Sequence, residues 1–154
     1  MVRAVCVDAS VAVKWVVREQ HTDAARALLI NATAERRPII APPHMSGEVT
    51  NTIYQRWRSA DPNRHLPEDF ADSALVQFFA IEIETLNPPR LHEQAYTFAK
   101  AFRISSIYDS LYVVLAQQYG VDLWTADARL LRECRGVAEW VRFIGDYHME
   151  LTGP

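Results

Sequence analysis

Two kinds of hydrophobic pattern alternate along the chain. Short, almost fully apolar runs occur at residues 4–7, 38–41 and 123–124, and such runs are typical of strands covered on both faces. Between them lie longer segments whose apolar residues recur every three or four positions, as in amphipathic helices. This alternation predicts an α/β domain with three layers (α/β/α) and a mainly parallel central sheet of about five strands.

The predicted elements fill most of the chain. A segment with period-two alternation at 81–86 predicts a further strand with one wetter face, and 141–144 predicts the last strand. Turn and capping signals, chiefly proline and glycine, separate the predicted helices from the strands. The first of these helices spans residues 11–17 and has Lys14 on its polar side. The others are a stretch beginning at 22, residues 44–58 and 68–80, a helix that begins at Pro88 or Pro89 and reaches 102, and residues 107–119 and 128–134.

Two of these helices carry apolar residues spaced four apart. We expect helix 107–119 to be buried on almost every side, because Leu111, Leu115 and Tyr119 follow this spacing and Tyr112 packs in the neighbouring apolar stripe with Val114. The helix at 44–58 has a similar stripe that we expect to face the core, formed by Met45, Val49, Ile53 and Trp57. Such helices belong at the centre of a domain.

The overall composition narrows the class of protein. The 154 residues predict one domain over 1–154, in which 146–154 forms a peripheral tail. A net charge of −3 provides no general positive field, so nucleic-acid binding would need a local basic patch. Cys6 and Cys134 are too few and too far apart for a disulfide framework or a zinc site, which fits a reducing cytoplasm. No apolar run approaches the length of a membrane span.

Four acidic residues occupy related places in the predicted fold. Asp8 follows the first strand and Asp127 follows the strand at 123–124. Glu48 lies one turn into the helix after the second strand, and Asp109 lies in the first turn of helix 107–119. Because functional sites in parallel sheets collect at the carboxyl ends of the strands, we expect all four to reach one edge.

Each acid also has an ordinary interpretation. Asp127 could cap the helix that follows, Asp8 could belong to a turn, and Glu48 could be a solvated helix residue. Asp109 has the capping-box spacing from Ser106, and an acid in the first turn of a helix suits the helix dipole. Together, however, four carboxylates in one cleft would repel one another strongly unless a cation lay between them. Oxygen ligands without His or Cys favour Mg²⁺ or Mn²⁺, which assist phosphoryl transfer and hydrolysis. The polar side chains expected to orient these acids or their waters are Ser10, Asn51 and Thr125.

Four short motifs around these acids resemble a known family. They are VDAS at 7–10, EVTN at 48–51, YDSLY at 108–112 and TADARL at 125–130. Their order and approximate spacing are similar to those of the PIN-domain ribonucleases, especially the VapC toxins of prokaryotic toxin–antitoxin pairs. The resemblance covers nearly the whole chain.

The resemblance implies a Mg²⁺- or Mn²⁺-dependent endoribonuclease. Asp8 and Asp109 would be direct metal ligands, and Glu48 and Asp127 would act through water or position a second ion. Water activated by the metal would cut an RNA phosphodiester and leave a 5′-phosphate and a 3′-hydroxyl. The family also implies a homodimer and a cognate VapB-like antitoxin whose tail fills the cleft, often presenting an arginine to the acids.

Four arginines are candidates for binding RNA phosphates. Arg56 and Arg58 lie at the end of helix 44–58, and Arg129 and Arg132 share a face of helix 128–134. A solvated surface, or a contact with acidic residues of an antitoxin, would explain them equally well. His44 has no paired ligand in the sequence, and we expect it to be structural or exposed.

Three other functions compete with a ribonuclease. An aspartyl-phosphate phosphatase would have an Asp-x-Asp pattern after the first strand, where this chain has Asp8-Ala9-Ser10. A response-regulator receiver would have adjacent acids near the first strand and a lysine after a late strand, and the chain has neither. A non-catalytic PIN-like module that acts through a protein partner remains open, because only metal binding or cleavage distinguishes it.

Overall fold

The structure is a computed structural model that describes residues 3–148. Within that range, five strands form one sheet in the order β3-β2-β1-β4-β5, and every neighbouring pair is parallel. The predicted mainly parallel sheet of about five strands is therefore confirmed. The strands are short: β1 (Val5–Val7), β2 (Ile39–Ala41), β3 (Glu84–Thr85), β4 (Leu123–Thr125) and β5 (Val141–Phe143).

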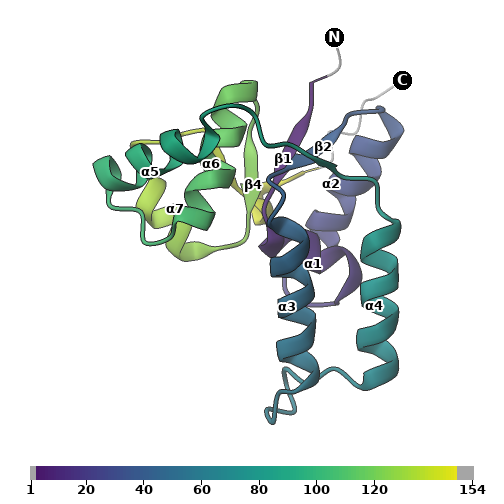
Figure 1. Cartoon of the computed structure of the whole chain (residues 1–154). Helices are drawn as coiled ribbons and strands as arrows, with labels where there is room; N and C mark the ends of the chain where they lie inside the picture. Colours follow the sequence, from purple (N-terminus) through teal and green to yellow (C-terminus); the bar gives the residue numbers. More distant parts are fainter. Residues whose placement is uncertain (1–2, 149–154) are drawn as a thin grey trace.

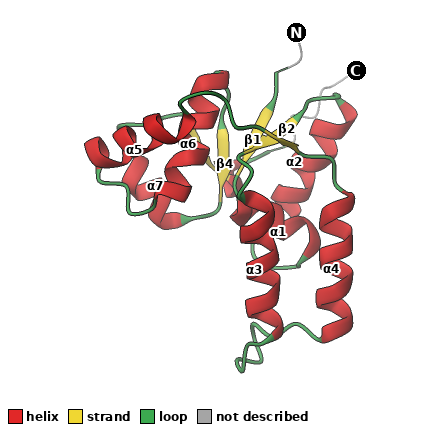
Figure 2. Cartoon of the chain, viewed as in Figure 1, coloured by secondary structure: helices red, strands yellow, loops and turns green. Residues whose placement is uncertain are grey.

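Helices cover both faces of the sheet, as the α/β/α prediction requires (Figures 1 and 2). Helix α6 packs on β1 and β4 with α5 beside it, while α1 packs on the other face and contacts α2, α3 and α4. The helices are α1 (Ala9–Val16), α2 (Thr22–Ala34), α3 (Met45–Trp57), α4 (Glu68–Ala80), α5 (Leu91–Phe102), α6 (Ile107–Tyr119) and α7 (Ala128–Cys134), followed by a 3-10 turn, η1 (Ile144–Asp146).

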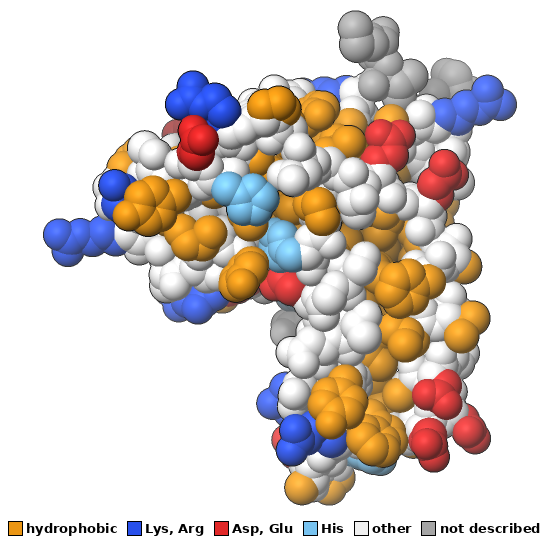
Figure 3. Space-filling model, viewed as in Figure 1, with side chains coloured by type: hydrophobic (Ala, Val, Ile, Leu, Met, Phe, Trp, Pro, Cys, Tyr) orange, Lys and Arg blue, Asp and Glu red, His pale blue; other side chains and the backbone are white. Residues whose placement is uncertain are grey.

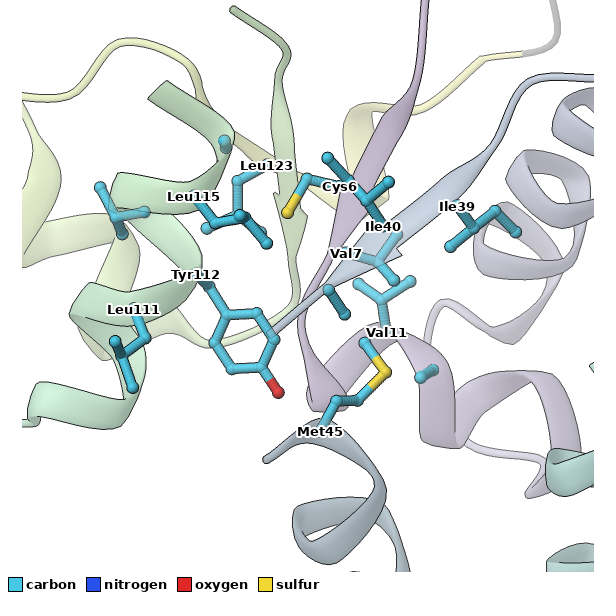
Figure 4. Close-up of a cluster of buried hydrophobic side chains, with 14 of the residues drawn as sticks. Cys6, Val7, Val11, Ile39, Ile40, Met45, Leu111, Tyr112, Leu115 and Leu123 are labelled. Carbon is cyan, nitrogen blue, oxygen red and sulfur yellow. The ribbon is translucent and has the colours of Figure 1, made fainter. Parts of the chain in front are cut away.

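The hydrophobic core lies on both faces of the central strands β1 and β4. Figure 4 shows Leu115 and Tyr112 of α6 on one side of the sheet and Val11 of α1 on the other. Cys6 and Leu123, in the strands between them, are completely buried. Because central strands of a parallel sheet are covered twice, they have no polar face, which explains their uninterrupted apolar sequences.

The edge of the sheet departs from the sequence prediction. The strand expected at 81–86 is reduced to Glu84–Thr85, and both of these residues are exposed. β3 pairs only with β2, so one side of it has no strand partner among the described residues. An alternating pattern does not by itself fix how far an edge strand follows its neighbour.

Helix α6 is buried along only part of its length. Residues 110–116 are all buried, whereas Tyr119 is 47% exposed, so its predicted place in the buried stripe is wrong. The helix ends at Gly120, whose φ of 62° is left-handed. The Gly120 N–H donates to the carbonyl of Ala116, which closes the last turn.

Helices α3 and α4 pack side by side and extend away from the sheet (Figure 1). Met45, Val49 and Ile53 of α3 are buried as predicted. Trp57, in the last turn, is 41% exposed and stacks on Tyr54 at 5.9 Å between ring centroids, so the prediction that it faces the core is wrong. The far end of this helix pair lies beyond the reach of the core.

The start of the predicted peripheral tail contacts the domain. The Tyr147 ring packs edge-on against Trp124 at 5.1 Å, and its hydroxyl accepts a hydrogen bond from the Asn31 side chain. The rest of the predicted tail, residues 149–154, lies outside the described residues. Over the range 3–148, no helix is both long and apolar enough to span a membrane.

Candidate active site

A cleft of about 450 Å³ opens where β1 and β4 end. Four different elements bring a carboxylate to its wall: the end of β1, helix α3, the first turn of α6 and the loop after β4. The parallel sheet therefore collects side chains that are far apart in sequence, as the sequence analysis expected. These residues are Asp8, Glu48, Asp109 and Asp127.

Asp8 is the most buried of the four acids. It is 5% exposed and caps α1, because its Oδ1 accepts a hydrogen bond from the Val11 N–H. The Ser10 hydroxyl donates to the same oxygen, and the Thr125 hydroxyl donates to the other oxygen, each at 2.5 Å. Both carboxylate oxygens of Asp8 are thus held in place.

Ser10 and Thr125 also hold the backbone of the loop that follows β4. The Ser10 hydroxyl accepts a hydrogen bond from the Ala126 N–H at 2.8 Å, and the Thr125 hydroxyl accepts one from the Asp127 N–H at 3.0 Å. The structure therefore places these two predicted orienting residues in direct contact with Asp8. Asn51, the third, lies on α3 and lines the cleft beside Glu48.

Glu48 is held by two aromatic side chains. The Tyr112 hydroxyl of α6 donates to Glu48 Oε1 at 2.7 Å, and His44 Nε2 lies 3.2 Å from the same oxygen. Burial alone would raise the pKa of Glu48, but His44 and the Tyr112 hydroxyl outweigh burial and hold that pKa below its ordinary value. The His44 ring also packs edge-on against Tyr112 at 4.8 Å, so this histidine is structural, as expected.

Asp109 and Asp127 share one arginine. Arg129 Nη2 lies 2.9 Å from Asp109 Oδ2 and 3.6 Å from Asp127 Oδ2. Asp127 also caps α7, because its Oδ1 accepts from the N–H groups of Arg129 and Leu130. The ordinary capping interpretation of Asp127 is therefore correct, and it coexists with a position on the wall of the cleft.

The electrostatics of the cleft disfavour full ionisation of its acids. Burial raises the pKa of Asp8 to about 6, despite the hydrogen bonds from Ser10 and Thr125, and the charge of Asp109 adds to the rise. Burial likewise raises the pKa of Asp109 to about 6. Arg129 opposes this second rise, whereas the charges of Asp127 and Glu48 reinforce it. A cation placed among these groups would relieve the repulsion.

The donor set fits a hard divalent cation. All four acids supply oxygen, and Mg²⁺ is usually held by one or two carboxylates together with several waters. Among residues 3–148, no three or more His, Cys, Asp or Glu side chains are grouped as a set of metal ligands. Asp8 and Asp109 lie close enough for the charge of Asp109 to raise the pKa of Asp8.

Basic residues line the same cleft, one or two helical turns from the acids. Lys14, expected on the polar side of its helix, is in fact only 7% exposed and pairs with Glu19 at 2.7 Å. Arg56 Nη1 pairs with the other oxygen of Glu19 at 2.6 Å. Arg64, from the loop between α3 and α4, also lines the cleft.

The four arginines predicted to bind RNA separate into two groups. Arg56 lines the cleft, and Arg129 contacts two of its acids. Arg58 and Arg132 are exposed and do not belong to the wall of the cleft. Arg58 instead lies over the ring of Tyr54, with its Cζ atom 5.8 Å from the ring centroid.

Sequence reasoning missed the roles of Tyr112, Lys14 and Glu19. Tyr112 was assigned to apolar packing. A buried tyrosine hydroxyl usually has a hydrogen-bond partner, and this rule was the available signal for its polar contact. Lys14 lies four residues after Ser10, which places the two on the same face of α1. That spacing was the available signal that this lysine faces the cleft.

Comparison with known proteins agrees with this architecture. Residues 5–135 match the model of the PIN domain family, a range that contains all four acids. The crystal structure of PAE2754 from Pyrobaculum aerophilum is similar, with a TM-score of 0.60 and 19% sequence identity over 94% of this chain and 93% of that chain. At this identity the likeness concerns the fold alone. No curated protein sequence matches the chain.

Proposed function

Because the chain belongs to the PIN domain family, whose fold is generally that of a nuclease, we propose that it is a Mg²⁺- or Mn²⁺-dependent endoribonuclease. The observation that carries this proposal is the convergence of four carboxylates from four separate elements on one cleft. Two of them, Asp8 and Asp109, have pKa values raised to about 6. Such an arrangement is unfavourable for an empty protein and favourable for a cation site.

The residues of the cleft would have different roles in the proposed hydrolysis. When bound, the metal would activate water and neutralise charge that develops on the phosphate. Asp8 and Asp109 would hold it directly, while Glu48 and Asp127 would position water at its rim. Ser10 and Thr125 keep both oxygens of Asp8 in a fixed orientation, and Tyr112 does the same for Glu48.

We further propose that the protein is the toxin of a VapBC-type pair, a homodimer inhibited by a VapB-like antitoxin. Large apolar side chains are exposed on α3 and α4, and Figure 3 shows hydrophobic groups gathered over this part of the surface. Exposed patches of this kind favour a protein partner. The contact of Arg129 with Asp109 and Asp127 supports the antitoxin proposal, since it shows that a guanidinium group fits against these acids.

The proposed activity is tested by one substitution with a matched control. Asp109→Asn keeps the shape of the side chain and removes its charge, while Asp122→Asn makes the same change at an acid that pairs with Arg142 outside the cleft. Cleavage of total cellular RNA is measured for the wild type and both variants with Mg²⁺, with Mn²⁺ and with a chelator. Circular dichroism verifies that each variant is folded.

We expect the wild type and Asp122→Asn to cut RNA in a metal-dependent way. Asp109→Asn should cut at least a hundredfold more slowly, because losing one charged ligand removes several kcal/mol of transition-state stabilisation. Equal cleavage by all three proteins would contradict the assignment of the cleft. Failure of the wild type to cut RNA or to bind Mn²⁺ would favour a non-catalytic module that acts through its partner.

A further inference from the structure

We propose that the basic end of the cleft, formed by Lys14, Arg56 and Arg64 with Glu19 between the first two, is a binding subsite for a second RNA phosphate. This inference rests on the proposed nuclease function and assigns a place to the RNA next to the cleavage point. The three cations come from α1, from α3 and from the loop between α3 and α4.

The subsite lies at a defined separation from the acids. Glu48 and Arg56 are both on α3, eight residues apart, so at 1.5 Å per residue their backbones are about 12 Å apart along the helix. Ser10, which holds Asp8, and Lys14 are one turn apart on α1. Both helices therefore lead from the acidic end of the same cleft to its basic end.

The arrangement of the cations is unusual for a simple surface ion pair. Lys14 is almost fully buried, and lysine is rarely buried unless its charge serves a purpose or is paired. Glu19 accepts from Lys14 with one oxygen and from Arg56 with the other, which fixes the positions of both cations. Arg56 Nε is buried and has no hydrogen-bond partner among the described residues, so the donor capacity of this guanidinium is not exhausted.

The charge balance of the subsite favours an anion. Three cations face one carboxylate, which leaves two net positive charges beside a strongly acidic site. Acidic residues that bind a metal repel the RNA backbone, so phosphates flanking the cleaved bond need compensating cations nearby. Arginine and lysine side chains within one cleft can supply them, since arginine binds phosphate through its planar fork and lysine binds it as a point charge.

Glu19 then has a positioning role. Glu19 accepts from both cations and so holds Lys14 and Arg56 in the wall of the cleft. The subsite is consequently organised before RNA arrives, which lowers the entropy lost on binding.

The test measures RNA binding separately from cleavage. All proteins carry Asp109→Asn, so that the RNA survives, and fluorescence anisotropy follows the binding of a short single-stranded RNA of random sequence over a range of salt concentrations. Arg56→Gln and Arg64→Gln each remove one cation of the subsite. Arg90→Gln, at an exposed arginine that precedes α5 and pairs with Glu93, removes the same charge outside the cleft.

We expect each subsite variant to bind RNA about tenfold more weakly than the Arg90→Gln control, the effect of one lost charge-assisted hydrogen bond. The slope of log affinity against log salt should fall by about 0.7 for each lost phosphate contact. Arg56→Lys, which keeps the charge, should keep the slope. If Arg56 had a purely structural role, Arg56→Gln would lower the melting temperature of the protein and leave the salt dependence of RNA affinity unchanged.

The outcomes separate this subsite from the nuclease proposal. If Arg56→Gln and Arg64→Gln both bind RNA with the affinity and salt slope of Arg90→Gln, the subsite proposal is overturned. Metal-dependent cleavage by the wild type would still support the nuclease proposal. Because Arg64 is exposed in a loop, its substitution cannot fail merely through unfolding. Absence of any RNA binding by the parent protein, together with absence of cleavage by the wild type, would overturn both proposals.

Discussion

At the scale of single residues, the candidate site depends on hydroxyl groups as much as on carboxylates. Tyr112 reaches Glu48 from the far side of the cleft, and Ser10 and Thr125 hold Asp8. Each hydroxyl donates to a charged oxygen, and such hydrogen bonds are stronger than neutral ones. The orientation of the acids is therefore set by neighbours that carry no charge themselves.

Removal of the Tyr112 hydroxyl tests this dependence. We expect Tyr112→Phe to lose about 1 kcal/mol of unfolding free energy, because Glu48 is partly exposed and water replaces part of the bond. RNA cleavage should slow by about tenfold as Glu48 loses its fixed orientation. Urea denaturation and single-turnover kinetics measure the two effects. Tyr108→Phe, at an exposed tyrosine in the same helix, is the control and should change neither.

Arg129 takes the place in which a divalent cation would interact with Asp109 and Asp127. We expect Arg129→Ala to bind Mn²⁺ about two- to fivefold more tightly at pH 8, because the arginine is half exposed and its ion pair is worth at most about 1 kcal/mol. Isothermal titration calorimetry measures the affinity. Arg132→Ala removes an exposed arginine from the same helix and should leave the affinity unchanged. A weaker affinity in Arg129→Ala would show that the arginine supports the metal site instead of competing with it.

The raised pKa of Asp109 predicts a pH-dependent stability in the presence of a chelator. A carboxyl group with a folded-state pKa of about 6, above its ordinary 3.8, favours the folded state only while it is protonated. Its contribution is fully present below about pH 4 and is lost as the pH rises through 6. We expect Asp109→Asn to be more stable than the wild type by about 1 to 3 kcal/mol at pH 8 and by much less near pH 4.

Thermal unfolding at the two pH values, with chelator present throughout, measures this difference. Asp122→Asn, which removes the same charge outside the cleft, is the control. If Asp109→Asn and the wild type are equally stable at both pH values, ionisation of Asp109 does not reduce the stability of the folded protein.

Sequence reasoning located the acids but missed several of their partners, for a physical reason. The rule that strand ends share one edge of a parallel sheet was sufficient to bring Asp8 and Asp127 together with Glu48 and Asp109. No comparable rule says which polar residue of a helix faces a wet cleft and which faces bulk solvent. Lys14 was assigned to the polar side of its helix for that reason, although this side faces the cleft and buries the lysine.

At the scale of secondary structure, the predicted elements agree well with the observed ones where packing is strong. Helices α4, α6 and α7 begin and end at the predicted residues, because proline, glycine and capping signals mark their ends. The errors occur where elements extend beyond the core. Trp57 and Tyr119 follow the apolar spacing of their helices, yet each lies in a last turn with its side chain exposed.

The end of α6 offers a test at this scale. Gly120 has a left-handed φ of 62°, and no atom lies close to the position that a Cβ would occupy. Strain of the backbone, not a clash, should therefore decide the effect of a substitution. We expect Gly120→Ala to lose about 1 kcal/mol of unfolding free energy and Gly120→Asn to lose less, since asparagine tolerates this conformation. Equal stability of Gly120→Ala and the wild type in urea would contradict this origin of the helix end.

At the scale of the whole molecule, the exposed apolar groups of α3 and α4 are the most evident unexplained surface. They belong to a helix pair that extends away from the sheet, and no other element among residues 3–148 covers them. The proposed homodimer would bury them. The members of this group are Tyr54, Trp57, Phe70, Val76 and Phe79.

We expect the purified protein to sediment with twice the mass of one chain, and Phe79→Asp to shift it towards the monomer. Phe79 is 60% exposed, so the substitution should not unfold the domain, and a charge in an apolar interface is unfavourable. Tyr96→Asp introduces the same charge at an exposed aromatic residue of α5 and should leave the mass unchanged. Sedimentation equilibrium measures both, and a dimer unaffected by Phe79→Asp would place the interface elsewhere.

The distance in sequence between the Asp8 and Thr125 hydrogen-bond partners has a consequence for synthesis of the protein. Asp8 is synthesised more than a hundred residues before Thr125, its hydroxyl partner in β4, and before Asp127, the fourth acid of the cleft. A nascent chain therefore cannot assemble the cleft while it is still short. The proposed nuclease would therefore lack its assembled cleft until the codon of Asp127 has been translated.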